Sequence, residues 1–213
     1  MSKLRTRRQK YYNIFSHFYD SFIKLHSHNY AEETRIFLVD SAQLEYKNQP
    51  RVLDICCGTG SVVLAFARHF PDILAVGYDF SLGMMHQAKK KDLSDQIIFI
   101  GGDAARLPFV NDCFDVVCCS HALYELKNQV RTDALSEMKR VAKPVGSVLI
   151  MEHEVPRRAF IKILFYIRML MMGPKDSQEF LKQDLSPFEK IFTHVKISHT
   201  PSDKSKLIIC RKE

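Results

Sequence analysis

The first 45 residues carry apolar side chains at spacings of three and four, which is the period of one face of an α-helix. The first such segment contains Tyr12, Phe15, Phe18, Tyr19, Phe22 and Ile23. A second segment with Ile36, Phe37 and Val39 follows the sequence Ala31-Glu32-Glu33. The pattern predicts two N-terminal helices, with residues 1–10 frayed.

From residue 51 onward the pattern changes to short apolar runs that alternate with amphipathic or apolar helical stretches. The apolar runs expected to carry strands are 51–60, which ends in Gly, 73–79, 97–103, 114–120 and 147–152, and the helical stretches are 61–70, 81–91 and 132–143. Runs that are apolar on both faces are typical of parallel strands covered by helices on both sides. The sequence therefore predicts an α/β fold with a doubly wound, Rossmann-like sheet.

Polar residues follow these predicted strands at the edge where such sheets bind ligands. They are the turn Asp54–Gly60, then Asp79, Asp103, the pair Ser120 and His121, and the pair Glu152 and His153. Three of the first four strand ends carry a carboxylate, a pattern that packing alone does not require.

The turn after the first strand has the form D-x-x-x-G-x-G, in which Gly58 and Gly60 allow backbone angles and a close ligand approach. The dinucleotide fingerprint is incomplete because Val63 stands at the place of its third glycine. Asp79, at the end of the next strand, suits the hydroxyls of a ribose. Asp103 is placed to accept a hydrogen bond from an adenine amine. The strand ends therefore predict a nucleoside site.

Four motifs, in this order and spacing, resemble the class I S-adenosylmethionine-dependent methyltransferases, and especially the ubiquinone/menaquinone biosynthesis group. They are VLDICCGTG, DFSLGMM, GGDAARLPFVNDCFDVV and KRVAKPVGSVLIME. The resemblance implies a seven-stranded sheet whose last strand is antiparallel, with residues 192–200 and 205–212 as its last two strands. It also implies S-adenosylmethionine as cofactor and a small acceptor that is apolar or lipid- or quinone-like.

The resemblance assigns each cofactor-binding role to a residue of this chain. Asp54 orients the turn near the methionine amino group, Gly58 and Gly60 border the methionine moiety, and Asp79 holds the ribose. Phe80 and Met84 lie beside the base or ribose, Asp103 and Ala104 recognise adenine, Ser120 backs the sulfonium, and Tyr19 closes over the cofactor. Cys56 departs from the pattern, since a glycine is common at its place in the loop.

Proton removal from a phenol or an activated carbon requires a base at the rim of the cofactor pocket. His121, Glu152 and His153 are the candidates, because they follow the fourth and fifth predicted strands. His121 has an alternative role as a helix-start residue bonded to the backbone.

Residues 159–172 are almost entirely apolar, and three interpretations remain open for them. They form a core helix, a lid over an apolar acceptor, or a helix at a membrane surface with basic neighbours between Arg157 and Lys175. The expected organisation is a single domain (1–213), with a helical cap (1–45), a cofactor-binding core (50–155), and the lid with the last two strands (156–213).

The net charge of +7 is concentrated at the two ends of the chain. Residues 1–10 sum to +5 and residues 151–213 to +4, whereas residues 11–150 sum to −2. A slightly acidic body argues against a nucleic-acid partner, and the basic ends favour a peripheral contact with a membrane surface.

The six cysteines show neither a disulfide framework nor a zinc-ligand spacing, and no secretory signal is found, so we expect a cytoplasmic protein without a bound metal. Two alternative functions remain. The adjacent pairs Cys56/Cys57 and Cys118/Cys119 suggest thiolates that hold a soft acceptor such as arsenite, although such residues are more often small buried hydrophobes. A non-catalytic, cofactor-binding scaffold is the other.

Overall fold

The computed structural model describes residues 3–27, 30–93, 96–155, 162–163, 166, 180 and 185–213. Seven strands form one sheet in the order β3-β2-β1-β4-β5-β7-β6. The strands are β1 (Arg51–Ile55), β2 (Leu74–Asp79), β3 (Ile97–Gly101), β4 (Phe114–Ser120), β5 (Ala142–His153), β6 (His194–His199) and β7 (Ser205–Arg211). Only β7 runs antiparallel to its neighbours, which confirms the predicted sheet.

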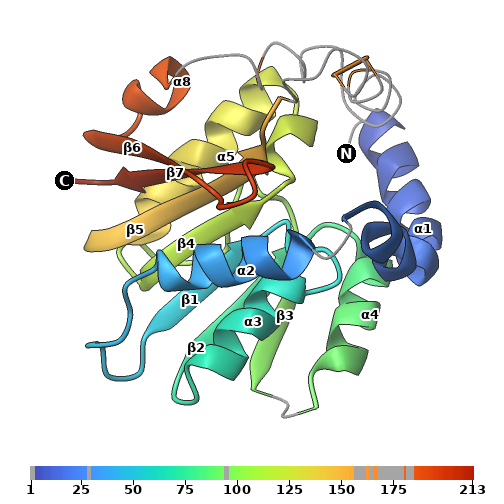
Figure 1. Cartoon of the computed structure of the whole chain (residues 1–213), viewed down its shortest axis with the longest axis horizontal. Coiled ribbons are helices and arrows are strands. Elements are labelled where there is room, and N and C mark those ends of the chain that lie inside the picture. Colours follow the sequence, from blue (N-terminus) through green and yellow to red (C-terminus); the bar gives the residue numbers. More distant parts are fainter. Residues whose placement is uncertain are drawn as a thin grey trace.

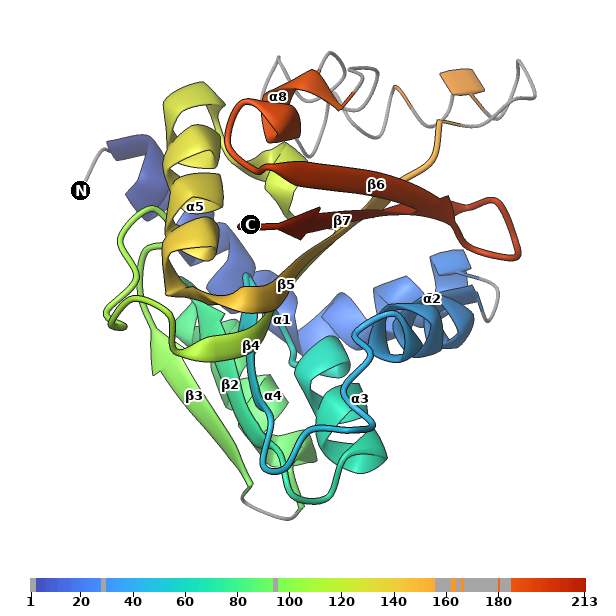
Figure 2. The same cartoon turned by 90° about the vertical axis from the view of Figure 1, so that its left-hand side faces the viewer.

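Helices cover both faces of this sheet, as the doubly apolar strands predict (Figures 1 and 2). On one face, α2 (Tyr30–Asp40) and α3 (Ser61–His69) pack over a core that includes Val52, Phe66 and Leu149. On the other face, α5 (Asn128–Val141) and α8 (Ser186–Glu189) pack over Leu53, Val117 and Ile150. Helix α4 (Leu82–Lys91) packs along β2 and β3.

The strand order reverses between β1 and β4, which are direct neighbours. Asp54 on β1 lies opposite Gly77 on β2 and Cys118 on β4. The carboxyl ends of β1, β2 and β4 therefore meet at one edge, and the loops that follow these strands form the ligand-binding crevice of such sheets.

Helix α1 (Lys3–Ser27) runs past this edge, on the right in Figure 1, and packs against α4. The expectation that residues 1–10 are frayed is wrong for residues 3–10, which belong to α1. This part of the helix is held by a tertiary contact, because the side-chain amide of Gln9 donates a hydrogen bond of 2.7 Å to the carbonyl of Phe80. Tertiary contacts thus extend the helix beyond its apolar pattern.

Strand β5 begins at Ala142, earlier than the predicted start at residue 147, and α5 ends at Val141. Pro144 ends the helix, and Ala142 pairs with Phe114 before the register shifts along β4. The helical segment expected at 159–172 lies outside the described residues except for 162–163 and 166. No helix in the described ranges is long and apolar enough to cross a membrane.

Candidate functional site

The turn between β1 and α3 departs from ordinary backbone angles at three positions. Cys56, Gly58 and Gly60 have φ values of 57°, 54° and 76°, in the left-handed region that favours glycine. This explains why a glycine is the expected residue where Cys56 stands.

The two glycines of the turn differ in what surrounds them. A Cβ on Gly58 would have no atom within 4 Å, so its backbone is open to an approaching ligand. A Cβ on Gly60 would lie 2.9 Å from the Cβ of Ala88 on α4. The open space at Gly58 leaves its expected place beside a ligand as a prediction, whereas Gly60 makes room for α4.

Asp79 joins this turn to the loop that follows β2. One carboxylate oxygen accepts a hydrogen bond of 2.9 Å from the amide of Gly58, and the other accepts one of 2.7 Å from the amide of Ser81. Burial raises the pKa of Asp79 to about 6, although these amides oppose the shift. Each carboxylate oxygen has a second lone pair, so Asp79 can still accept a hydroxyl from a ribose.

Asp54 lies deeper under the turn and is fully buried. Its carboxylate accepts a hydrogen bond from the amide of Val63 at 3.2 Å and one from the thiol of Cys118 at 3.6 Å. Burial raises the pKa of Asp54 to about 7. Asp54 therefore positions the first turn of α3 from below and is linked to β4 through Cys118.

Asp103 follows β3 and is half-buried, with its carboxylate accepting a 3.1 Å hydrogen bond from the amide of Ala105. Ala104, between them, is buried. The hydroxyl of Tyr78 donates to the carbonyl of Asp103 at 3.4 Å. This hydrogen bond holds the loop after β3 against β2. Asp79 and Asp103 therefore lie at the ends of two adjacent strands.

Helix α1 binds three of the loops at this edge through polar side chains that the sequence reasoning missed. The side-chain oxygen of Asn13 accepts hydrogen bonds from the Ser81 hydroxyl at 2.8 Å and from the Gly83 amide at 3.0 Å. Asp20 accepts one of 2.6 Å from the hydroxyl of Thr59, inside the glycine turn. Polar residues at helical spacing inside an aromatic-rich helix were the signal that could have indicated this face.

A partly buried polar cluster joins α1 to the short 3₁₀ helix η1 (Leu123–Glu125), which follows β4. The hydroxyl of Tyr12 donates a hydrogen bond to the carboxylate of Glu125, and Arg8 forms an ion pair of 2.7 Å with the same carboxylate. Burial raises the pKa of both Tyr12 and Glu125. Glu125 was not predicted, because nothing local in the sequence distinguishes it from a solvated acid.

Three aromatic or apolar residues assigned to the cofactor lie on α1 or near it. The ring of Phe80 packs edge-on against Tyr12 at 5.8 Å, and Met84 is buried in the first turn of α4. Tyr19 is half-buried, packs edge-on against Phe15, and lies two helical turns from Tyr12 on the same side of α1. The structure thus brings these positions to the covered edge.

The candidate bases lie together at the ends of β4 and β5. The ring nitrogens of His121 form hydrogen bonds with the hydroxyls of Ser120 at 3.0 Å and Ser205 at 2.9 Å. The rings of His121 and His153 are 4.4 Å apart. His121 also has a φ of 51° and donates its amide to the carbonyl of Met151, so it combines a ring network with a backbone role.

Glu152 is the most buried of these candidates. Its Oε1 accepts a hydrogen bond of 3.2 Å from the amide of Tyr124, whereas its Oε2 has no hydrogen-bond partner among the described residues. Burial raises the pKa of Glu152 to about 8, so that the carboxylic acid predominates at neutral pH.

Three of the four paired cysteines, Cys57, Cys118 and Cys119, do not provide reactive thiolates, and burial raises the pKa of the Cys57 thiol well above its ordinary value. Cys118 and Cys119 are fully buried. Burial raises the pKa of the Cys118 thiol well above its ordinary value, and a hydrogen bond with Cys56 together with burial does the same for Cys119. These three thiols remain protonated, which does not favour the soft-acceptor alternative.

Comparison with known proteins agrees with this geometry. Residues 52–146 match the family described as a methyltransferase domain. A demethylmenaquinone methyltransferase from Roseiflexus castenholzii is 37% identical over 124 residues, which are 58% of this chain and 51% of that protein. A ubiquinone/menaquinone biosynthesis C-methyltransferase (UbiE) from Geotalea daltonii is 30% identical over 183 residues, or 82% of this chain and 76% of that protein.

Among solved structures, human N-acetylserotonin methyltransferase in complex with SAM superposes with a TM-score of 0.70. It is 16% identical, and the match covers 97% of this chain and 57% of that one, so it shows the fold. The sheet, the glycine turn and the strand-end acids define an S-adenosylmethionine-binding methyltransferase fold. The chain belongs to the class I S-adenosylmethionine-dependent methyltransferases. Within that class it is similar to the ubiquinone/menaquinone biosynthesis group, and it spans about half the length of the Roseiflexus relative.

Proposed function

We propose that this protein transfers the methyl group of S-adenosylmethionine to a small apolar acceptor of the quinone or lipid-like class. The observation that carries the proposal is the position of the Asp79 carboxylate, which accepts hydrogen bonds from the amides of Gly58 and Ser81. Asp79 ends β2, the strand between β1, which carries Asp54, and β3, which Asp103 follows. Family membership supports the cofactor. The curated relatives, which are named for demethylmenaquinone and ubiquinone/menaquinone biosynthesis, support the class of acceptor.

The residues at the edge fit this cofactor. Asp79 accepts hydrogen bonds from the ribose hydroxyls, and Asp103 with Ala104 recognises adenine, with the ring of Phe80 beside them. Gly58 offers an open backbone to the methionine moiety, because a Cβ there would meet nothing within 4 Å. Asp54, Gly60, Met84 and Ser120 support the loops around it, and Tyr19 closes the site from α1.

The bound cofactor supplies a methyl group on a positively charged sulfur, which is a good leaving group. The task of the protein is therefore to orient the acceptor and to exclude water. Helix α1 serves the second purpose, because Asn13, Asp20 and Tyr12 bind it to the loops after β2, β1 and β4 respectively. Cofactor exchange then requires these contacts to open.

An acceptor that must lose a proton requires a base at the same edge. His121 is the candidate base, and its ring is oriented by the hydroxyls of Ser120 and Ser205. The ring of His153 packs against it at 4.4 Å and helps to fix its position. Glu152 is fully buried and held as the carboxylic acid, so it is not the base, and its Oε1 positions the amide of Tyr124 beside the site.

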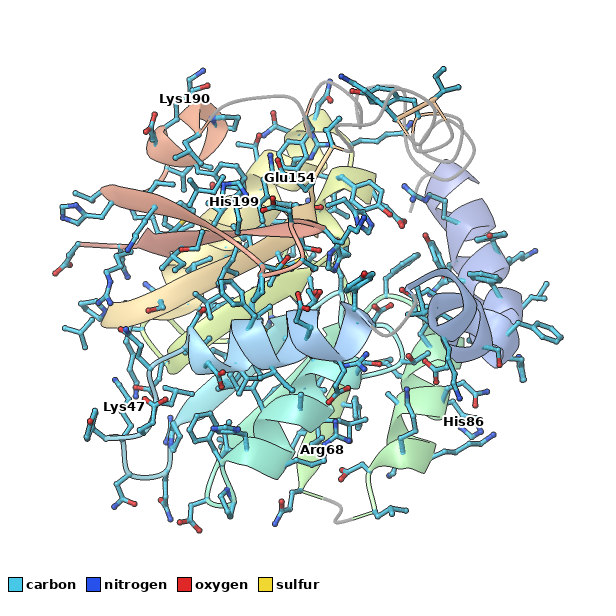
Figure 3. The ribbon with its side chains drawn as sticks, viewed as in Figure 1. Lys47, Arg68, His86, Glu154, Lys190 and His199 are labelled. Atoms are coloured by element: carbon cyan, nitrogen blue, oxygen red, sulfur yellow. The ribbon has the colours of Figure 1, made fainter. Side chains whose placement is uncertain are left out.

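The cofactor part of the proposal is tested by calorimetry with S-adenosylhomocysteine. We expect Asp79→Asn to weaken binding by roughly tenfold or more, because one acceptor of the ribose is lost. Asp115→Asn is the matched control: Asp115 is an equally buried acid, paired with Lys47 and Lys143. Lys47 lies at the opposite side of the molecule from α1 (Figure 3). Equal affinity of Asp79→Asn and the wild type would refute the ribose role.

The acceptor part is tested by methyl transfer from labelled S-adenosylmethionine to a short-chain demethylmenaquinol, compared with a catechol and with arsenite. We expect transfer to the quinol and little to arsenite. His121→Ala is expected to lower turnover while leaving S-adenosylhomocysteine affinity unchanged. Full turnover by His121→Ala would dismiss its role as base, and transfer to arsenite alone would overturn the acceptor class.

A further inference from the structure

Helix α1 has its polar side turned toward the protein. Gln9, Asn13 and Asp20 lie on one side of the helix and bind the loops after β2 and β1. Ser16, on the same side, is buried. This is the reverse of an ordinary surface helix, whose apolar side faces the core.

The opposite side of α1 is apolar and exposed to solvent. Tyr11, Ile14 and Phe18 follow one another at helical spacing and are 51%, 70% and 66% exposed. We call these three residues the outer face of α1. A scattered apolar residue on a surface needs no explanation, but three large ones along one side of a helix indicate an interaction surface.

The charge around the outer face identifies the kind of partner that it fits. The first ten residues contain five basic residues and no acid. Arg8 is paired with Glu125 on the inner side of α1, which leaves Lys3, Arg5, Arg7 and Lys10 in the N-terminal part of the helix. Lys10 is exposed one turn before Ile14. A second copy of the chain would bring two such basic segments together, whereas an anionic bilayer attracts them.

We propose that the outer face of α1 binds the surface of an anionic bilayer, with Ile14 and Phe18 inserted among the lipids and the basic N-terminal segment at the headgroups. An apolar helical face flanked by basic residues is the ordinary form of an interfacial helix. Because the inner side of α1 binds the cofactor loops, the bilayer would lie directly over the covered edge of the sheet. The proposal does not depend on the acceptor.

Sedimentation with lipid vesicles tests the proposal on the full chain. Neutral vesicles of phosphatidylcholine are compared with vesicles that also contain phosphatidylglycerol, at low and high salt. We expect binding to the anionic vesicles, weakened by salt, and little to the neutral ones. The double variant Ile14→Gln/Phe18→Gln should bind at least about tenfold more weakly, because the inserted apolar area is lost.

A control variant removes two even more exposed apolar side chains elsewhere on the surface. Tyr46 and Leu93 are 98% and 97% exposed, so Tyr46→Gln/Leu93→Gln should bind vesicles as the wild type does. Both double variants should keep wild-type affinity for S-adenosylhomocysteine, which shows that they fold and separates this test from that of methyl transfer.

Three results would overturn the proposal. The first is absence of binding to anionic vesicles by the wild type. The second is equal binding by Ile14→Gln/Phe18→Gln and the wild type. The third is a dimer in analytical ultracentrifugation that this variant abolishes, which would assign the outer face of α1 to a second copy of the chain.

Discussion

Tyr12 on α1 donates its hydroxyl hydrogen bond to the carboxylate of Glu125 on η1, across a separation of 113 residues in the sequence. The same carboxylate pairs with Arg8, and its other oxygen accepts a 3.3 Å hydrogen bond from the hydroxyl of Tyr124. A partly buried acid with three partners holds its geometry closely, because each lost partner leaves partly desolvated charge behind. This cluster therefore fixes one end of α1 over the loop that follows β4.

Tyr12→Phe should loosen α1 while leaving its aromatic packing against Phe80 in place. We expect a loss of about 1–3 kcal/mol in the free energy of unfolding, since Glu125 keeps its burial but loses a donor. The dissociation rate of S-adenosylhomocysteine, measured by stopped flow, should rise. Tyr11→Phe, on the exposed side of the same helix, serves as control. An unchanged dissociation rate in Tyr12→Phe would show that α1 does not control cofactor exchange.

Arg131 should be required for the conformation of η1. Its guanidinium donates to the carbonyls of Leu123, Tyr124 and Leu126 at 3.1, 3.3 and 2.6 Å, from a buried position on α5. Arg131→Met removes this shared donor from the three carbonyls, and we expect a loss of about 2–4 kcal/mol in unfolding free energy. Hydrogen exchange at the amides of η1 reports the effect. Protection equal to that of the wild type would contradict this role.

The two glycines of the turn should separate ligand binding from stability. Gly60→Ala places a Cβ 2.9 Å from that of Ala88, so we expect it to lower the melting temperature most. Gly58→Ala meets no neighbour and adds only the cost of a positive φ, about 1 kcal/mol, but its methyl group points into the open approach. It should therefore weaken S-adenosylhomocysteine binding more than it lowers stability. The reverse order in calorimetry and thermal unfolding would refute this division.

Glu152 should make stability depend on pH. Its folded-state pKa of about 8 lies above its ordinary value of 4.5, so the folded chain keeps a proton that the unfolded chain loses. Its contribution to stability is complete below the ordinary value and is lost as pH rises toward 8. Glu152→Gln carries no such proton and should flatten the decline in unfolding free energy between about pH 5 and about pH 8.

Urea denaturation across this range measures that effect. Part of the decline should persist in Glu152→Gln, because burial also raises the pKa values of Asp54 and Asp79, to about 7 and about 6. Identical pH profiles for Glu152→Gln and the wild type would mean that Glu152 is not held as the neutral acid.

The sequence by itself determined the class of fold, the order of its strands and helices, and the cofactor. Runs such as residues 73–79 are apolar on both faces and end in an acid, so strand, burial and ligand edge are all encoded within a few neighbouring residues. The glycine turn is also recognised from neighbouring residues. The sequence did not show that Gly58 is open whereas Gly60 packs against α4, because that difference depends on where α4 lies.

The orientation of α1 was decided only by the tertiary structure. Helical periodicity indicates that Tyr11, Ile14 and Phe18 share a face, but not whether that face is buried or exposed. The polar partners of Asn13, Asp20 and Tyr12 come from loops far away in the sequence, and these bonds turn the apolar side outward. Glu125 becomes a site residue for the same reason, since its role exists only where α1 and η1 meet.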